Sequence, residues 1–128
     1  MNATLAKCML SAVISLAALP AMAGDPPQCV SKLPKSVQKM VASFNDCARA
    51  DNPTAACEKV ELNARGYDNA QGLLPKLGAL GPKYWRAAPR LLGSPQGLVY
   101  LVQEGSQGKP ITQRYYTADQ FASFCRIR

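Results

Sequence analysis

The sequence has 128 residues, with 15 Lys and Arg against 8 Asp and Glu, so that its formal net charge is +7. It contains no histidine, which excludes catalysis by an imidazole. The absence of histidine, together with the absence of a Cys-x-x-Cys pair, also argues against a zinc site. A chain of this length suits a single domain with one core, and no repeat or low-complexity segment divides it.

The first predicted element is a secretory signal at residues 1–23. Lys7 gives a positive start, residues 8–19 are apolar, and residues 21–23 read Ala-Met-Ala, which fits the small-x-small rule for cleavage. The apolar run is too short to span a membrane, and no later run reaches the roughly 20 apolar residues that a span needs. We therefore expect cleavage near Ala23, a single mature domain at residues 24–128, and a secreted or periplasmic protein.

Two helices are predicted next. Pro34 suits the first turn of a helix, and the spacing i, i+3, i+4 and i+7 places four apolar residues on one helical face: Val37, Met40, Val41 and Phe44. This helix should end between residues 45 and 51. After the break at Asn52-Pro53, residues 54–62 favour a second short helix that carries Cys57.

Strands are predicted in the second half of the chain. Residues 98–102 are rich in β-branched and aromatic side chains, residues 111–117 alternate less cleanly, and residues 121–127 end the chain with similar positions. Residues 104–110, with two glycines and a proline, connect the first two runs. Helices followed by consecutive antiparallel strands predict an α+β domain.

Four cysteines follow the predicted signal: Cys29, Cys47, Cys57 and Cys125. An even number in an exported chain indicates two disulfides, and four cysteines allow three connectivities. Spacing alone leaves these three open.

The positive charge lies in the C-terminal half. Residues 24–75 hold 6 basic and 6 acidic side chains, whereas residues 76–128 hold 8 basic side chains against Glu104 and Asp119. Such a field favours a polyanion, either RNA or an acidic protein face. A solubilising surface without a partner is the alternative.

Three stretches of the sequence share their order with one known family. Residues 29–34 read Cys-Val-Ser-Lys-Leu-Pro, residues 67–75 read Tyr-Asp-Asn-Ala-Gln-Gly-Leu-Leu-Pro, and residues 115–124 read Tyr-Tyr-Thr-Ala-Asp-Gln-Phe-Ala-Ser-Phe. With these stretches the chain resembles the barnase-like microbial guanyl-specific ribonucleases. The first resembles the start of disulfide-closed members, the second the guanine-binding loop, and the third the closing Tyr-Tyr-Thr-x-Asp-His-Tyr-x-Ser-Phe segment.

The resemblance implies an N-terminal helix packed on a curved antiparallel sheet, with the active site on the exposed face of the sheet. It implies that Cys29 pairs with Cys125, which leaves Cys47 for Cys57. It implies neither a metal nor a cofactor. We expect a monomer.

Catalysis in this family needs a carboxylate base, an imidazole acid, and guanidinium groups around the phosphate. The resemblance places Gln120 at the acid position, and a glutamine amide cannot release a proton near neutral pH. It places Arg86 at the base position, and no Asp or Glu occurs between Asp68 and Glu104. The family carries an arginine on the strand that corresponds to residues 98–101 here, and these residues include no arginine. A cation would therefore have to come from Arg86, Arg90 or Arg114.

The guanine-binding loop shows similar losses. Tyr67 and Asn69 are kept, while Ala70 replaces an arginine and Gln71 replaces the glutamate that reads guanine. An uncharged acceptor forms a weaker hydrogen bond, so guanine preference should weaken. Phe121 replaces a tyrosine. The candidate RNA-binding residues are therefore Tyr67, Asn69, Gln71, Arg114 and Phe121.

Three functions are compatible with this pattern. The first is a pseudoenzyme, an exported module that binds RNA or an acidic protein through a basic sheet face without cutting RNA. The second is an active endoribonuclease with rearranged catalytic residues, using Glu104 with Arg86 or Arg90. The third is a secreted immunity or inhibitor protein that blocks a toxin or hydrolase.

Overall fold

The computed structural model describes residues 24–128, so the predicted signal at residues 1–23 lies outside the described residues. In chain order the elements are α2 (Lys35–Cys47), α3 (Pro53–Glu58), β1 (Leu62–Gly66), β2 (Pro82–Pro89), β3 (Gly97–Gln103), β4 (Ile111–Thr117) and β5 (Cys125–Arg126). No helix within this range is long and apolar enough to cross a membrane.

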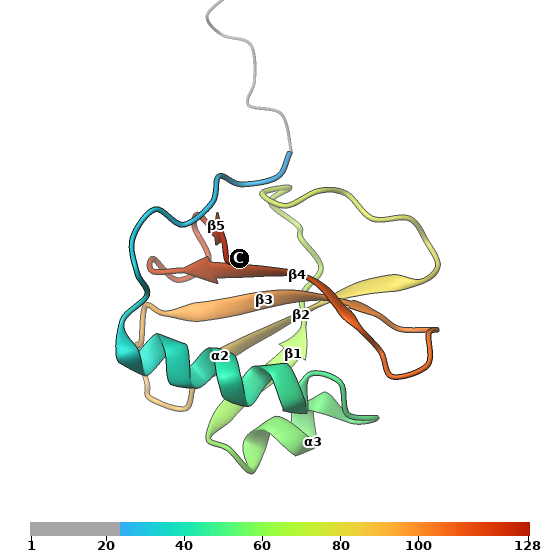
Figure 1. Ribbon diagram of the computed structural model, residues 1–128, viewed down its shortest axis with the longest axis horizontal. Coiled ribbons are helices and arrows are strands. Elements are labelled where there is room, and N and C mark those ends of the chain that lie inside the picture. Colours follow the sequence, from blue (N-terminus) through green and yellow to red (C-terminus); the bar gives the residue numbers. More distant parts are fainter. Residues whose placement is uncertain (1–23) are drawn as a thin grey trace, which may run out of the picture.

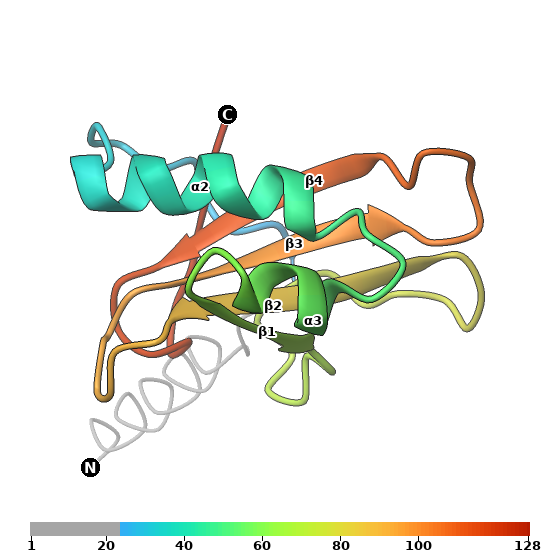
Figure 2. The same cartoon turned by 90° about the horizontal axis from the view of Figure 1, so that it is seen from below.

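The strands form one antiparallel sheet in which each strand pairs with its neighbours in the chain, in the order β1-β2-β3-β4-β5. Figures 1 and 2 show α2 lying across one face of this sheet, with α3 beside β1. Helices that precede consecutive antiparallel strands make an α+β domain, as predicted.

The main core lies between α2 and the sheet. Val37, Met40 and Phe44 are buried on one face of α2, as their spacing predicts. Alternate residues of β3 meet them, and the ring centroids of Phe44 and Tyr100 are 4.4 Å apart. The Tyr100 hydroxyl donates a hydrogen bond to the Val41 carbonyl (3.2 Å), so this buried polar group has a partner.

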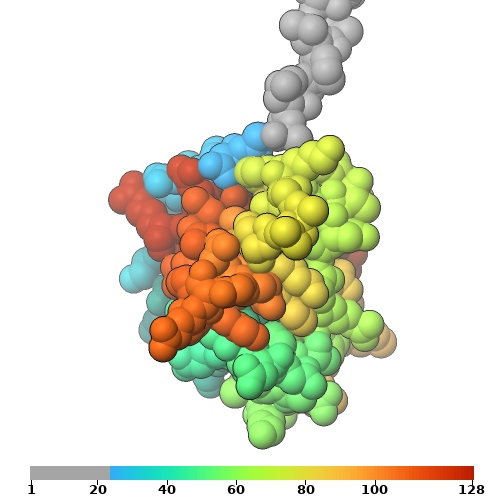
Figure 3. All heavy atoms as spheres, turned by 90° about the vertical axis from the view of Figure 1, so that its right-hand side faces the viewer, coloured from blue at the N-terminus to red at the C-terminus, as the bar shows by residue number. Residues whose placement is uncertain are grey.

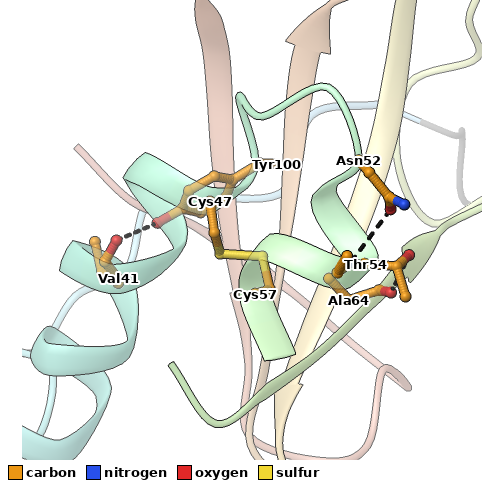
Figure 4. The surroundings of a disulfide bond; sticks show 8 residues. Val41, Cys47, Asn52, Thr54, Cys57, Ala64 and Tyr100 are labelled. Atoms are coloured by element: carbon orange, nitrogen blue, oxygen red, sulfur yellow. Dashed lines mark hydrogen bonds between the residues drawn. A yellow bond between two sulfur atoms is a disulfide. The ribbon is translucent and has the colours of Figure 1, made fainter. Parts of the chain in front are cut away.

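The Cys47–Cys57 disulfide joins the end of α2 to α3 (Figure 4). The Asn52 side chain caps α3 by accepting a hydrogen bond from the Ala55 amide (3.2 Å). The Thr54 hydroxyl donates to the Ala64 carbonyl (2.9 Å), which attaches α3 to β1. Together these contacts hold the outermost strand, β1, against the rest of the domain.

The Cys29–Cys125 disulfide closes the chain over a sequence separation of 96. The N-terminal segment lies along β5, where the Cys29 amide donates to the Arg126 carbonyl (2.9 Å). These two disulfides are the pairing that the ribonuclease resemblance implies.

Two predicted elements were wrong in extent. The second helix ends at Glu58, and Leu62 already begins β1. The strand predicted at residues 121–127 is reduced to Cys125–Arg126 because Gln120 and Phe121 have positive φ (56° and 67°), which interrupts the extended backbone. Strands β1 and β2 were not predicted from the pattern of residues.

The two disulfides should differ in their effect on stability. In the chain-entropy model, a loop of about 100 residues contributes about 4.7 kcal/mol and a loop of about 10 residues contributes less than 3 kcal/mol. We expect replacement of Cys29 and Cys125 by Ser to lower the free energy of unfolding more than replacement of Cys47 and Cys57 by Ala. Urea unfolding of both double variants measures this, and the reverse order would show that the buried Cys47–Cys57 bond acts mainly through packing.

Candidate functional site

The sheet face opposite α2 carries a second, smaller cluster of buried side chains: Leu74, Tyr84, Val99 and Tyr115. Tyr67, Phe121 and Phe124 pack on this cluster and remain partly exposed. We call the surface formed by these three rings and the strand residues beneath them the open face.

Hydroxyl groups of the buried tyrosines have defined partners. The Tyr84 hydroxyl donates to the Pro75 carbonyl (2.7 Å), and the Tyr115 hydroxyl donates to Asp25 Oδ1 (2.8 Å). Burial and then the negative charge of Asp25 raise the pKa of Tyr84 to about 12. Burial and then the hydrogen bond to Asp25 raise the pKa of Tyr115 as well. Both rings therefore stay neutral and serve the fold.

The loop of residues 67–75 is held by Asn69. Its side chain donates to the Leu74 carbonyl (2.8 Å) and accepts from the Leu74 amide (3.1 Å), and its φ is 56°. The amide is thus occupied within the loop, and Asn69 shapes this loop rather than presenting its side chain to a ligand. Gln71 is exposed and lines neither hollow beside the loop.

The turn of residues 118–124 is organised by Asp119. Its carboxylate accepts hydrogen bonds from the Thr117 hydroxyl (2.7 Å) and the Ser123 amide (2.9 Å). Hydrogen bonds from Ser123, and then from Thr117, hold the pKa of Asp119 below its usual value. The turn is therefore fixed by its own side chains, and Gln120 is exposed on it.

Phe121 is turned inward onto the open face. Its ring lies against Gly97 of β3, where a Cβ atom would overlap it, and its centroid is 6.2 Å from that of Tyr67. The Arg86 guanidinium lies 5.3 Å from the centre of the same ring. Phe121 therefore contacts both the sheet and this guanidinium, and its ring remains partly exposed.

A hollow of about 480 Å³ lies at the outer edge of β1 and β2, lined by Arg65, Gly66, Tyr67, Asp68, Lys83 and Arg86. Arg65 and Arg86 are directly opposite each other in the β1–β2 register. The Lys83 ammonium lies 4.6 Å from the centre of the Trp85 ring. Among residues 24–128, no carboxylate lies within 4.0 Å of any of these three cationic groups.

The other candidate residues lie elsewhere. We expected Arg114 among the RNA-binding residues of the open face. It lies instead on the α2 side of the sheet, where its Nε donates a hydrogen bond to Asn45 Oδ1 (2.9 Å). Arg90 is 3.8 Å from Glu61 beyond the far end of β2. Glu104 accepts from the Trp85 indole (3.2 Å), on the α2 side.

The position of Glu104 follows from two loops that meet at one end of the sheet. Residues 75–81 and 104–110 lie side by side there (Figure 3), and the Glu104 amide donates to the Gly81 carbonyl (3.3 Å). Arg90, at the opposite end of β2, and Arg86, on the open face, are separated from it. The combination of Glu104 with Arg86 or Arg90 as catalytic groups is therefore not assembled.

Three residues of this surface were missed by sequence reasoning: Arg65, Lys83 and Asp25. Arg65 and Lys83 belong to strands that the sequence pattern did not predict. The sequence therefore gives no indication that these two residues lie at the same edge of the sheet. Asp25 lies two residues after the predicted signal, and only the fold brings it to Tyr115 and Arg126.

The hollow can attract an anion, because three cationic side chains line it together with only one carboxylate, Asp68. Burial, and then the negative charge of Asp68, raise the pKa of Tyr67 above its usual value. Within residues 24–128, no three Cys, Asp or Glu side chains gather as metal ligands. No family model, curated protein or solved structure matches the chain.

Substitution of Gly97 tests the placement of Phe121. We expect Gly97→Ala to displace the ring and to lower the free energy of unfolding by about 1–3 kcal/mol, as overpacking does. In a Phe121→Ala background the same substitution should cost much less, because the clashing ring is gone. Denaturant unfolding of the four proteins in this cycle measures the coupling, and equal costs in both backgrounds would contradict the contact.

Stability should fall at alkaline pH. The pKa of Tyr84 is about 12 in the folded protein, against 10.0 for an ordinary tyrosine. The contribution of this neutral tyrosine is therefore complete below pH 10 and is lost between pH 10 and 12, at about 1.4 kcal/mol for each pH unit. Unfolding by urea from pH 8 to 11, beside an absorbance titration of tyrosinate, checks this. Ionisation of Tyr84 near pH 10 in the folded protein would refute it.

Proposed function

We propose that this protein is an exported, non-catalytic member of the microbial ribonuclease fold that binds RNA at the hollow formed by Arg65, Lys83, Arg86 and Tyr67. The arrangement of a helix across an antiparallel sheet supports the fold assignment. The loop closed by Asn69, the turn organised by Asp119 and the Cys29–Cys125 disulfide support it further.

The absence of cleavage follows from the groups that face the open sheet. The expected base position holds Arg86, whose guanidinium lies on Phe121, and directly opposite it is a second arginine, Arg65. Gln120 at the expected acid position is exposed and has no proton to give. Loss of a general acid or base costs about 10²–10⁴-fold in rate for each group.

Binding of RNA is supported by the combination of charge with an aromatic ring. Three cationic groups and Tyr67 line one hollow, and Tyr67 also lines the adjacent hollow. Cations that follow the phosphates and a ring on which a base can stack are what single-stranded RNA requires. An acidic protein surface would use the cations but has no need of the ring. This juxtaposition is the observation that favours RNA.

Binding and cleavage of a short single-stranded RNA test the proposal. If three phosphates are neutralised, the affinity at 200 mM salt should be about 20-fold weaker than at 50 mM. Tyr67→Ala should weaken binding about tenfold through lost stacking, while the matched control Tyr67→Phe keeps the ring and the affinity. Fluorescence anisotropy measures binding, and gel electrophoresis after long incubation should show intact RNA.

Two results would overturn the proposal. One is cleavage that Arg86→Gln or Tyr67→Ala abolishes, because contaminating nuclease would be unaffected. The other is equal affinity for polyglutamate and for RNA in wild type and Tyr67→Ala, which would indicate an acidic protein as the partner.

A further inference from the structure

We infer that the hollow at the edge of β1 binds a terminal phosphate, so that the RNA recognised is a strand that ends in a phosphomonoester. This inference rests on the proposed RNA binding for the identity of the ligand, but the anion site itself is argued from the residues that line it. Four features carry it: net charge, an unpaired backbone amide, access for Lys83 and the pairing of two arginines.

The charge of the hollow suits a dianion. Three cationic side chains and one carboxylate, Asp68, line it. Asp68 accepts a hydrogen bond from the Ala70 amide (3.0 Å) and so is turned toward its own loop. A phosphodiester carries a single negative charge, whereas a phosphomonoester carries about −1.5 to −2 at pH 7. With Asp68 counted, the lining carries a net charge of +2, which a phosphomonoester matches more closely than a phosphodiester does.

Gly66 supplies a backbone donor at the same place. At the ends of the β1–β2 ladder the Tyr67 amide donates to the Tyr84 carbonyl (2.9 Å) and the Arg90 amide to the Glu61 carbonyl (3.2 Å). In an antiparallel ladder, opposite residues that exchange hydrogen bonds alternate with opposite residues that do not. Tyr67 belongs to a bonded pair, so Gly66, next to it, belongs to a non-bonded pair and its amide points outward from β1. Within residues 24–128 it has no partner.

The outward direction is confirmed two residues earlier. Ala64 is two residues before Gly66, so its backbone groups point in the same direction as those of Gly66. The Ala64 carbonyl accepts a hydrogen bond from the Thr54 hydroxyl (2.9 Å) on the outer side of β1. This contact also occupies the edge at Ala64, so an added peptide strand would find only a short free stretch. The edge therefore suits a compact anion better than a docked strand.

The glycine at position 66 also gives Lys83 its position. A Cβ atom there would lie 3.3 Å from Lys83 Cε, closer than ordinary van der Waals contact. Without that atom, the Lys83 side chain passes over Gly66 on the α2 side of the sheet, where its ammonium lies 4.6 Å from the centre of the Trp85 ring, and reaches the edge of the hollow. Gly66 is thus a positioning residue in addition to a donor.

The two opposed arginines lower the stability of the protein when no anion is bound. Arg65 and Arg86 are directly opposed across two strands, and like charges so placed are destabilising. A bound dianion would convert this repulsion into charge-assisted hydrogen bonds, for which guanidinium groups have the right geometry.

Affinities for one RNA sequence with a 5′-phosphate, a 3′-phosphate or two hydroxyl ends test the inference. We expect one phosphorylated end to bind about tenfold more tightly than the hydroxyl form, as one or more charged hydrogen bonds would provide. Which end benefits identifies the strand direction. The advantage should shrink from pH 7.5 to pH 5.5, because the second ionisation of a phosphomonoester has a pKa near 6.

Variants separate binding from structure. Arg65→Gln should remove most of the tenfold advantage, whereas Lys39→Gln, which removes one exposed charge from α2, should leave it intact. Arg65→Gln should also raise Tm by about 1–4 °C, since it relieves the opposed charges. A merely structural Arg65 would give a lower Tm.

The outcomes are distinct for the two proposals. Equal affinity for all three RNAs, unchanged in Arg65→Gln, overturns the phosphate site and leaves RNA binding standing. Binding of inorganic phosphate that is lost in Arg65→Gln, with no binding of any RNA, supports the site and overturns the proposed function. Failure of both phosphate and phosphorylated RNA to bind overturns the inference.

Discussion

The contact between the Phe121 ring and the backbone of Gly97 determines what the open face can do. Two consecutive residues in the left-handed region, Gln120 and Phe121, turn the ring onto the sheet. Such backbone strain persists only where the surroundings fix it, and here the hydrogen bonds of Thr117 and Asp119 do so. The ring therefore occupies the part of the open face between Gly97 and the Arg86 guanidinium.

Much of the fold could be predicted from the sequence because its strongest elements have clear periodicity. The apolar face of α2 and the β-rich runs of β3 and β4 were found at nearly their observed bounds. Strand β1 alternates between buried and exposed residues over only four positions, too few to indicate a strand by themselves, and β2 begins and ends with proline, which argues against a strand. The terminal strand was overestimated because nothing in the sequence signals positive φ at Gln120.

Register explains why only part of the site was predicted. Tyr67, Arg86 and Phe121 lie together as the ribonuclease resemblance led us to expect, but Arg114 lies on the other face, next to Tyr116, whose side chain packs toward α2. A difference of one residue in a strand reverses the face. Arg65 and Lys83 could be assigned only once β1 and β2 were paired, because a residue's charge gives no information about its cross-strand neighbour.

The opposed arginines provide a general argument about this surface. Isolated exposed cations solubilise a protein at little cost, so their presence alone is weak evidence for a ligand. Here, however, three cations line one hollow beside an outward-pointing amide, while the nearest carboxylate, Asp68, is hydrogen-bonded within its own loop. Random placement on a solubilising surface would intersperse the signs, and a Glu at either arginine position would give a favourable cross-strand pair. A surface that forgoes that stabilisation at one point is better explained by an anion that binds there than by solubility.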